Sequence, residues 1–167
     1  MKDNSFKSNR LHFRPFQQDD LSAVRELMSD AETMKYTSYE RAQGEDKIRE
    51  ALGKWIDDGG KGVWAVQLNQ SSKVVGWCML KLTTFECPEL GYMVNRKYCG
   101  QGFATEIALA TIKHGFEHLK HTLVMARVRV ENPPSIRVLE KSGFKISDKY
   151  SSLETPNLIY FECTKSL

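Results

Sequence analysis

The stretch NRKYCGQGFATE, from Asn95 to Glu106, places two glycines two residues apart between a strand-like run and a long helical one. Glycine at such a junction either relieves a tight turn or clears space for a ligand to approach the backbone. The first turn of a helix leaves N–H groups without intrahelical partners and carries partial positive charge. Residues 100–104 would therefore offer donors to a phosphate, although a plain tight turn explains the glycines as well.

Two nucleotide-binding motifs are excluded at this junction. The dinucleotide motif Gly-x-Gly-x-x-Gly would need a third glycine where Thr105 stands, and the Gly-Lys-Ser/Thr of a phosphate-binding P-loop is absent.

Hydrophobic periodicity on both sides of this stretch predicts one α/β domain over residues 1–167, with a mixed sheet. Because Glu89–Val94 and Leu123–Val130 flank the long helix, they should be parallel neighbours with a right-handed crossover. The other expected strands are one around Leu11 and Phe13, a hairpin of Gly62–Leu68 and Lys73–Leu82, and a closing hairpin of Phe144–Lys149 and Leu158–Thr164. Helices are expected from Asp19 through Met28, over Glu45–Ile56, after Gly102 and after Asn132.

The composition is that of an ordinary globular domain. The 167 residues carry a net charge of only +3, with basic and acidic side chains interspersed, so nucleic acid is not an expected partner. The polar N-terminus does not resemble a signal peptide, and no apolar run approaches the roughly 20 residues of a membrane span. The four cysteines contain no Cys-x-x-Cys pair and are expected to be reduced, mostly buried thiols of a cytoplasmic protein.

A second segment, residues 131–144 (ENPPSIRVLEKSGF), begins a helix directly after the second parallel strand. Asn132 is suited to cap this helix, Pro133 to its first position and Gly143 to its end. Its start should lie beside the Gly100 loop, at the carboxyl edge of the parallel pair. That edge is where α/β sheets bind ligands.

These segments resemble the GNAT acetyltransferases. Residues 97–104 are similar to the motif Arg/Gln-x-x-Gly-x-Gly/Ala, and Gly-x-Gly-Phe-Ala-Thr-Glu is typical of the RimJ/RimL-like branch. Residues 132–144 are similar to a second motif of that branch, and residues 89–92 and 11–15 also fit. The resemblance covers nearly the whole chain and departs at Lys97, where the family often has Arg or Gln.

The resemblance implies a mostly antiparallel sheet with a central parallel strand pair, flanked by helices. It implies acetyl-CoA as cosubstrate, inserted between the splayed parallel strands, and no metal. Backbone groups of Met93 and Val94 should pair with the pantetheine arm, and the pyrophosphate should lie on the amides from Gly100 to Thr105. Asn132 is either a pantetheine ligand or only a helix cap. The expected cofactor-binding residues are Met93, Val94, Lys97, Gly100, Gln101, Gly102, Phe103, Ala104, Thr105 and Asn132.

The implied chemistry is direct attack of a neutral amine on the thioester. The resemblance gives Ser135 the role of proton donor to the departing thiolate, although a serine in a first helical turn is also ordinary. Glu89 is the expected base, acting through water, with Glu86 as a nearby rival; either is alternatively a solvated strand carboxylate. Tyr36, Tyr39 and Trp55 lie where the family walls the acceptor pocket, though packing explains them as well.

Several alternatives remain open at this level. The acceptor is either a protein N-terminus or a small amine or amino acid, and a homodimer is compatible with the resemblance. A non-catalytic acyl-CoA sensor on the same fold would use the same binding residues. The segment His114 to His118 matches the inverted zinc-protease pattern His-x-x-Glu-His, but the sequence suggests neither a third ligand nor a cleft there.

Overall fold

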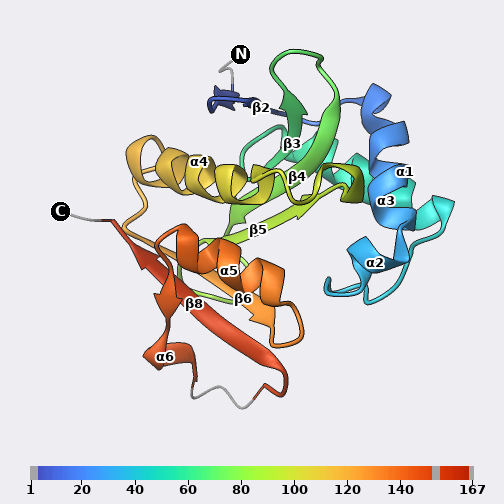
Figure 1. Ribbon diagram of the computed structural model, residues 1–167. Helices are drawn as coiled ribbons and strands as arrows, with labels where there is room; N and C mark the ends of the chain where they lie inside the picture. The colour runs from blue at the N-terminus through green and yellow to red at the C-terminus, as the bar shows by residue number, and fades with distance from the viewer. Residues whose placement is uncertain (1–3, 152–154, 166–167) are drawn as a thin grey trace.

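A mixed sheet of eight strands organises the molecule in the computed structural model, which describes residues 4–151 and 155–165. The strand order is β1-β2-β3-β4-β5-β6-β8-β7, and every neighbouring pair is antiparallel except β5 and β6. The mixed sheet with one central parallel pair confirms the expected fold class (Figure 1). The strands are β1 Phe6–Lys7, β2 Leu11–Arg14, β3 Val63–Leu68, β4 Val74–Lys81, β5 Glu89–Val94, β6 Leu123–Arg129, β7 Lys145–Ile146 and β8 Leu158–Thr164.

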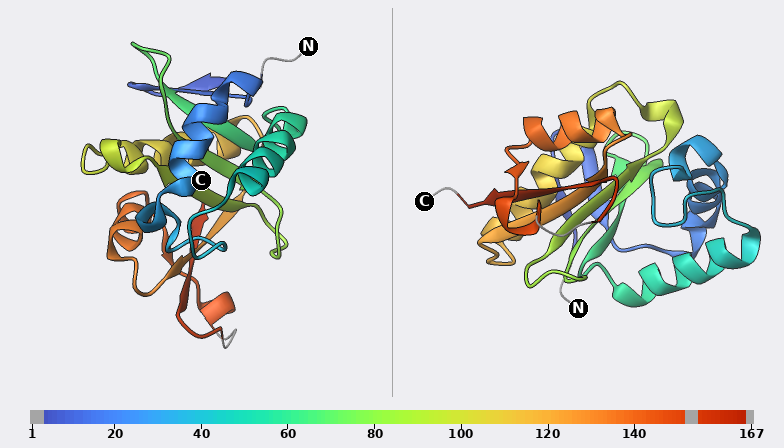
Figure 2. Two further views of the ribbon diagram at one scale, coloured as in Figure 1. Left: turned by 90° about the vertical axis from the view of Figure 1, so that its right-hand side faces the viewer. Right: turned by 90° about the horizontal axis from the view of Figure 1, so that it is seen from below.

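Helices cover both faces of this sheet. Strand β3 shows the division, because Trp64 and Val66 pack into the cluster that contains α4 and α5, while Val63 and Ala65 pack into the cluster under α1 and α3. Figure 2 shows α1 and α3 together on their side of the sheet. The α-helices are α1 Leu21–Ser29, α2 Ala31–Met34, α3 Glu45–Asp58, α4 Phe103–Glu117, α5 Pro133–Lys141 and α6 Asp148–Ser151, and the 3-10 helices are η1 Gln18–Asp20 and η2 Arg96–Tyr98.

The two parallel strands touch only at one end. Their register has a single pair, Glu89 with Met125, next to a hydrogen bond of 2.8 Å from the Met125 N–H to the Pro88 carbonyl. Past Glu89, no described residue of β6 pairs with β5, whereas β4 pairs along the whole of β5. The edge of β5 that faces β6 is therefore open towards the carboxyl ends of both strands.

The start of α1 explains how the α1–α3 layer is attached to the sheet. Asp20 is buried and accepts hydrogen bonds of 2.8 Å from both guanidinium nitrogens Nη1 and Nη2 of Arg14 at the end of β2. It also accepts one from the Gln17 N–H. A buried carboxylate with three donors is satisfied, so this aspartate fixes the turn from sheet to helix.

The C-terminal segment confirms the antiparallel pairing of the expected closing hairpin but corrects the extent of its first strand. Strand β7 has only two residues and is followed by α6, while β8 pairs with both β7 and β6, along its full length with β6. The reason is burial: Tyr160 and Phe161 of β8 lie in the core, whereas both residues of β7 are exposed. β8 therefore occupies the interior position and β7 the edge.

Two smaller expectations were wrong. Val130 was expected to be the last residue of the strand from Leu123, but β6 ends at Arg129 and Val130 is 44% exposed. Of the four cysteines, only Cys78 is buried, and burial raises its pKa to about 12. Cys87 and Cys163 are half-buried and Cys99 is exposed. Among the helices of the described residues, none combines the length and the apolar character needed to cross a membrane.

Candidate active site

The glycine loop before α4 has the backbone that its sequence predicts. Gly100 and Gly102 have φ angles of +76° and +80°, a region that favours glycine, and Gly102 is the N-cap of α4. A Cβ built on Gly100 would meet no atom within 4 Å, so the space beside it is not filled by the protein. The turn therefore needs its glycines, and the first-turn amides of Phe103, Ala104 and Thr105 have no acceptor within the helix.

The N-terminal segment braces this loop. Arg10 donates from Nε to Glu106 at 2.6 Å and from Nη1 to the Gln101 carbonyl at 3.0 Å, and its guanidinium lies 4.3 Å from the centroid of the Phe103 ring. Ser8 also donates to Glu106, at 2.7 Å. The pKa of Glu106 is lower than its ordinary value. Burial alone would raise this pKa, but the hydrogen bonds from Ser8 and Arg10 outweigh the effect of burial. This carboxylate is thus held beside the loop by its own partners.

Lys97 was expected among the cofactor-binding residues, but its side chain is engaged elsewhere. Its ammonium forms an ion pair with Glu26 of α1, which raises the pKa of the lysine. Both side chains are largely exposed, so this pair contributes little to stability. The Lys97 N–H also donates to the Asn95 side-chain oxygen, at 3.0 Å, and the Lys97 side chain ties η2 to α1.

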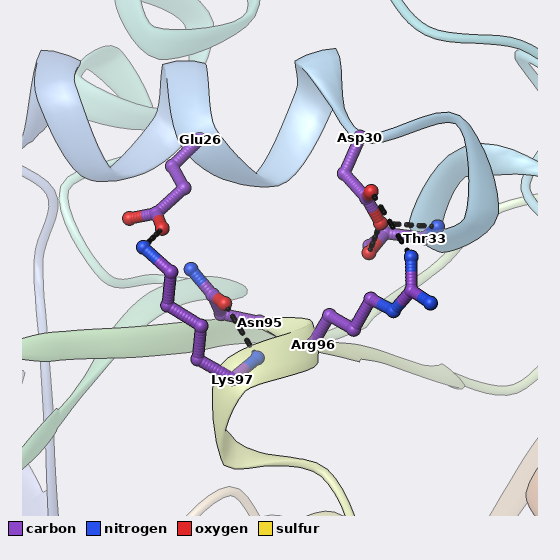
Figure 3. Close-up of a pocket in the computed structure, with 6 residues that line it drawn as sticks. All are labelled: Glu26, Asp30, Thr33, Asn95, Arg96 and Lys97. Atoms are coloured by element: carbon purple, nitrogen blue, oxygen red, sulfur yellow. Dashed lines mark hydrogen bonds and ion pairs between the residues drawn. The ribbon is translucent and has the colours of Figure 1, made fainter.

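A pocket of about 340 Å³ lies between α1, α2 and this part of the loop (Figure 3). Acidic side chains enter it from the helices and basic ones from η2, and each basic group faces an acidic partner. Arg96 lies 3.9 Å from Asp30, which also accepts from the Thr33 N–H as the N-cap of α2. The pocket wall is therefore internally paired. It is lined by Glu26, Asp30, Thr33, Asn95, Arg96 and Lys97.

At the start of α5, Asn132 and Ser135 lie as the capping pattern predicts. The Asn132 side-chain oxygen accepts a hydrogen bond of 3.3 Å from the Ser135 N–H, so the capping role of Asn132 is confirmed. The Ser135 hydroxyl lies 2.8 Å from the hydroxyl of Tyr92 on β5. This contact joins α5 to β5 at the point where β5 and β6 have separated.

Glu89 lies at the closed end of the parallel pair. It is 4% exposed; one carboxylate oxygen accepts from Arg127 Nε at 2.8 Å and the other from the Thr83 hydroxyl. It belongs to the sheet face opposite Tyr92, since strand residues alternate in direction. Its rival Glu86 is almost fully exposed and pairs only weakly with Lys149, at 3.4 Å.

The remaining expected residues divide between the sheet edge and the α1–α3 layer. Met93 is buried in the cluster under α1 and α3, and Val94 packs towards α4 and α5, so only their backbones face the open edge of β5. Trp55 packs between Phe16 and Trp77, with ring centroids 4.8 and 5.3 Å away, which supports its packing role. Tyr39 is exposed and lines a second pocket with Trp55.

The partners of the site were not expected from the sequence. Tyr92 was quoted only as part of a motif, and Arg127, Thr83 and Arg10 were given no role. Tyr92 and Ser135 are 43 residues apart, and Glu89 and Arg127 are 38 apart, so no local spacing indicates these pairs. The one available signal was the parallel neighbour relation of β5 and β6.

The zinc-protease pattern falls on a packed part of α4. The His114 ring stacks on Phe6, with centroids 4.1 Å apart, and its Nδ1 is buried without a partner. Within residues 4–151 and 155–165, no three His, Cys, Asp or Glu side chains group in a way that would hold a metal ion. The two histidines of the pattern contact each other, with ring centroids 5.2 Å apart.

Comparison with known proteins shows which family the sequence belongs to. A family model described as an acetyltransferase (GNAT) domain matches residues 10–145. The sequence is 27% identical over 143 residues to the protein named uncharacterized N-acetyltransferase p20 of Bacillus licheniformis. The alignment covers 83% of this chain and 80% of that protein.

Solved structures agree with this match. The crystal structure of a GNAT-family acetyltransferase from Bacillus anthracis superposes with a TM-score of 0.83 at 31% identity, over 96% of this chain and 98% of that one. A spermidine N-acetyltransferase from Vibrio cholerae, in complex with CoA and spermine, gives 0.75 at 19% identity, over 94% and 96% of the two chains. This second likeness shows the fold alone.

Proposed function

Because the chain belongs to the GNAT acetyltransferase family, it is an acetyl-CoA-dependent acyltransferase, and we propose that its acceptor is an α-amino group. That amine would be carried by a peptide N-terminus, as in the RimJ/RimL-like branch, or by an amino acid. Binding of acetyl-CoA is supported by a coincidence of three features at one sheet edge, and the α-amine acceptor by the hydrogen bonds of Glu89 described below. The open edge of β5, the glycine loop and the Ser135 hydroxyl meet at the carboxyl end of the parallel pair.

Acetyl-CoA fits the residues present. The backbones of Met93 and Val94 on the open edge would pair with the pantetheine arm, much as an added strand does. The pyrophosphate would lie on the amides of residues 100–105, where the space beside Gly100 is open. The side-chain oxygen of Asn132 accepts the capping hydrogen bond of α5, so its side-chain amide nitrogen is the group that would bind a ligand.

The reaction is attack of the neutral amine nitrogen on the thioester carbon. A C–N bond forms, the C–S bond breaks, and the sulfur leaves with the electron pair. The Ser135 hydroxyl would donate a hydrogen bond to this sulfur and so stabilise the charge that develops on it. The amine loses one proton and the thiol gains one, so the overall reaction is balanced.

The surroundings of Glu89 favour an α-amine over a lysine. An α-amino group with a pKa of about 8 is roughly one-tenth neutral at pH 7, whereas a lysine side chain is neutral below about one part in a thousand. A lysine acceptor therefore needs strong base assistance. Both oxygens of Glu89 already accept hydrogen bonds, from Arg127 and Thr83, so taking up a proton would cost one of these bonds.

A pair of matched peptides tests this assignment. One peptide has a free N-terminus and no lysine, and the other is N-acetylated with a single internal lysine. We expect thiol release from acetyl-CoA with the first peptide to exceed that with the second by at least about 100-fold, from the neutral fractions alone. Equal rates, or a preference for the lysine peptide, would contradict the assignment. Binding of acetyl-CoA without turnover on peptides, amino acids or amines would instead favour the non-catalytic sensor.

A further inference from the structure

The Tyr92 hydroxyl has no part in the function proposed so far. It projects from β5 towards the first turn of α5, where it lies 2.8 Å from the Ser135 hydroxyl and 3.4 Å from the Ser135 carbonyl oxygen. Its ring packs against the core under α4 and α5. The Tyr92 side chain therefore links β5, past its one pairing with β6, to the first turn of α5.

The direction of this hydrogen bond decides what Ser135 can do. A serine hydroxyl has one proton to donate and two lone pairs, and a phenol likewise donates once. If Ser135 donated to Tyr92, it would have no proton left for a ligand. Burial raises the pKa of Tyr92 to about 12, so both hydroxyls keep their protons at neutral pH and the phenol is able to donate to Ser135. The nearer acceptor is the Ser135 hydroxyl, at 2.8 Å rather than 3.4 Å.

We propose that Tyr92 is a positioning residue, which donates to the Ser135 oxygen and thereby directs the Ser135 proton to the sulfur of acetyl-CoA. This inference rests on the proposed function, since it concerns the same leaving group. Tyr92 keeps its proton throughout the reaction. It occupies one lone pair of Ser135 and polarises the hydroxyl, as chains of hydrogen bonds do, while the C–S bond breaks and the sulfur receives the bond from Ser135.

The first test uses CoA in its thiol form and needs no turnover. Thiolate absorbance gives the pKa of the thiol when bound to the wild type, to Tyr92→Phe and to Ser135→Ala. We expect the thiol pKa in both variants to lie above the wild-type value by about 0.5 to 1 unit, because the thiolate loses an aligned donor. The same thiol pKa in Tyr92→Phe and wild type would overturn the inference.

The second test is a double-mutant cycle on turnover. Tyr92→Phe should lower kcat about 5- to 20-fold, with the KM for acetyl-CoA changed less than about twofold. Ser135→Ala should lower kcat further, and the double variant should match Ser135→Ala, because Tyr92 acts through Ser135. Multiplying effects in the double variant would show that Tyr92 acts independently and would overturn the inference.

Tyr160→Phe is the matched control. Tyr160 is a buried tyrosine of β8 whose hydroxyl donates to Thr155 at 3.0 Å, so this variant also loses one hydroxyl contact. It should retain wild-type kcat and thiol pKa. The two proposals fail in different ways. If CoA does not bind the wild type, the proposed function fails and this inference falls with it. If CoA binds and Tyr92→Phe changes neither quantity, only the inference fails.

Discussion

The backbone N–H and the hydroxyl of Ser135 have different partners. Its N–H donates to Asn132, and its hydroxyl meets Tyr92, which is the nearest polar group of β5. Removing the Ser135 hydroxyl should therefore alter the chemistry of the site without altering its backbone, because the cap of α5 uses the Ser135 N–H.

We expect Ser135→Ala to lower kcat about 10- to 100-fold while the KM for acetyl-CoA changes less than about threefold. The control is Ser142→Ala, which removes a hydroxyl bonded to the Val138 carbonyl at the other end of α5. Steady-state kinetics under conditions where chemistry limits the rate give both constants. An unchanged kcat in Ser135→Ala would leave Ser135 an ordinary first-turn serine.

A second prediction for a single residue concerns Glu89. Glu89→Gln removes the charge that pairs with Arg127, which is 39% exposed, and should lower the unfolding free energy by about 1–2 kcal/mol. If Glu89 accepts the amine proton through water, kcat should also fall at least about 10-fold. Glu86→Gln is the matched control, because its carboxylate is almost fully exposed, and kcat should be unchanged. Equal kcat in both variants and wild type would remove Glu89 from the chemistry.

Among the elements, the glycine loop and the N-terminus of α4 act as one unit. Arg10, Glu106 and Ser8 hold the loop from outside, and the glycines give it its backbone. Because the amides do the binding in this account, changes to the backbone should matter more than changes to side chains.

Gly102→Val should raise the KM for acetyl-CoA at least about 10-fold, since valine is strained at a φ of +80° and the helix start would shift. Lys97→Met should change it less than about threefold, because that side chain is paired with Glu26. Gly53→Ala, at an exposed position of α3 with no atom within 4 Å of the new Cβ, should leave it unchanged and raise stability by about 0.5–1 kcal/mol. Steady-state kinetics give the KM of all three variants, and urea denaturation gives the stability of Gly53→Ala. A stronger effect of Lys97→Met than of Gly102→Val would contradict the backbone account.

The sequence predicted these elements well where their signals are local. The bounds of β5 and the starts of α3, α4 and α5 follow from periodicity, caps and glycines within a few residues. The short pieces α2, η2 and α6 were missed because four residues or fewer carry too little periodicity. The position of β8 between β6 and β7 was also missed, because pairing across some 35 residues depends on burial that no local pattern encodes.

The same distinction holds for the site. The glycine loop and the Asn132 cap are local and were predicted. The contacts of Tyr92 with Ser135 and of Glu89 with Arg127 join distant segments, and they follow only once β5 and β6 lie side by side.

For the whole molecule, apolar clusters on both sides of the sheet contribute to stability. The core under α4 extends to Phe6 at the N-terminus through the stacked ring of His114, which also contacts Trp64. Burial, with a smaller contribution from His118, lowers the pKa of His114 below its ordinary value of 6.5. His114 is therefore easier to protonate in the unfolded chain than in the folded one. Its contribution to the unfolding free energy is complete above pH 6.5 and is lost as the pH falls.

His114→Phe should therefore keep the stacking and remove both the titration and the unpaired Nδ1. We expect the unfolding free energy at pH 7 to be unchanged or up to about 1 kcal/mol higher. Its fall between about pH 7 and pH 5 should be shallower than in the wild type, though not absent, since burial also lowers the pKa of His121. Urea denaturation at several pH values measures this; an identical pH dependence would show that His114 does not contribute.

The central claim is that the molecule carries acetyl from acetyl-CoA to an amine at the open end of its parallel strand pair. The most direct measurement is release of free thiol from acetyl-CoA against a panel of short peptides with different N-termini, amino acids and small amines, with mass spectrometry of the products. We expect thiol release that depends on the acceptor, and products heavier by one acetyl group on the α-amine. Failure of acetyl-CoA to bind, checked by calorimetry on the same sample, would contradict the account at its foundation.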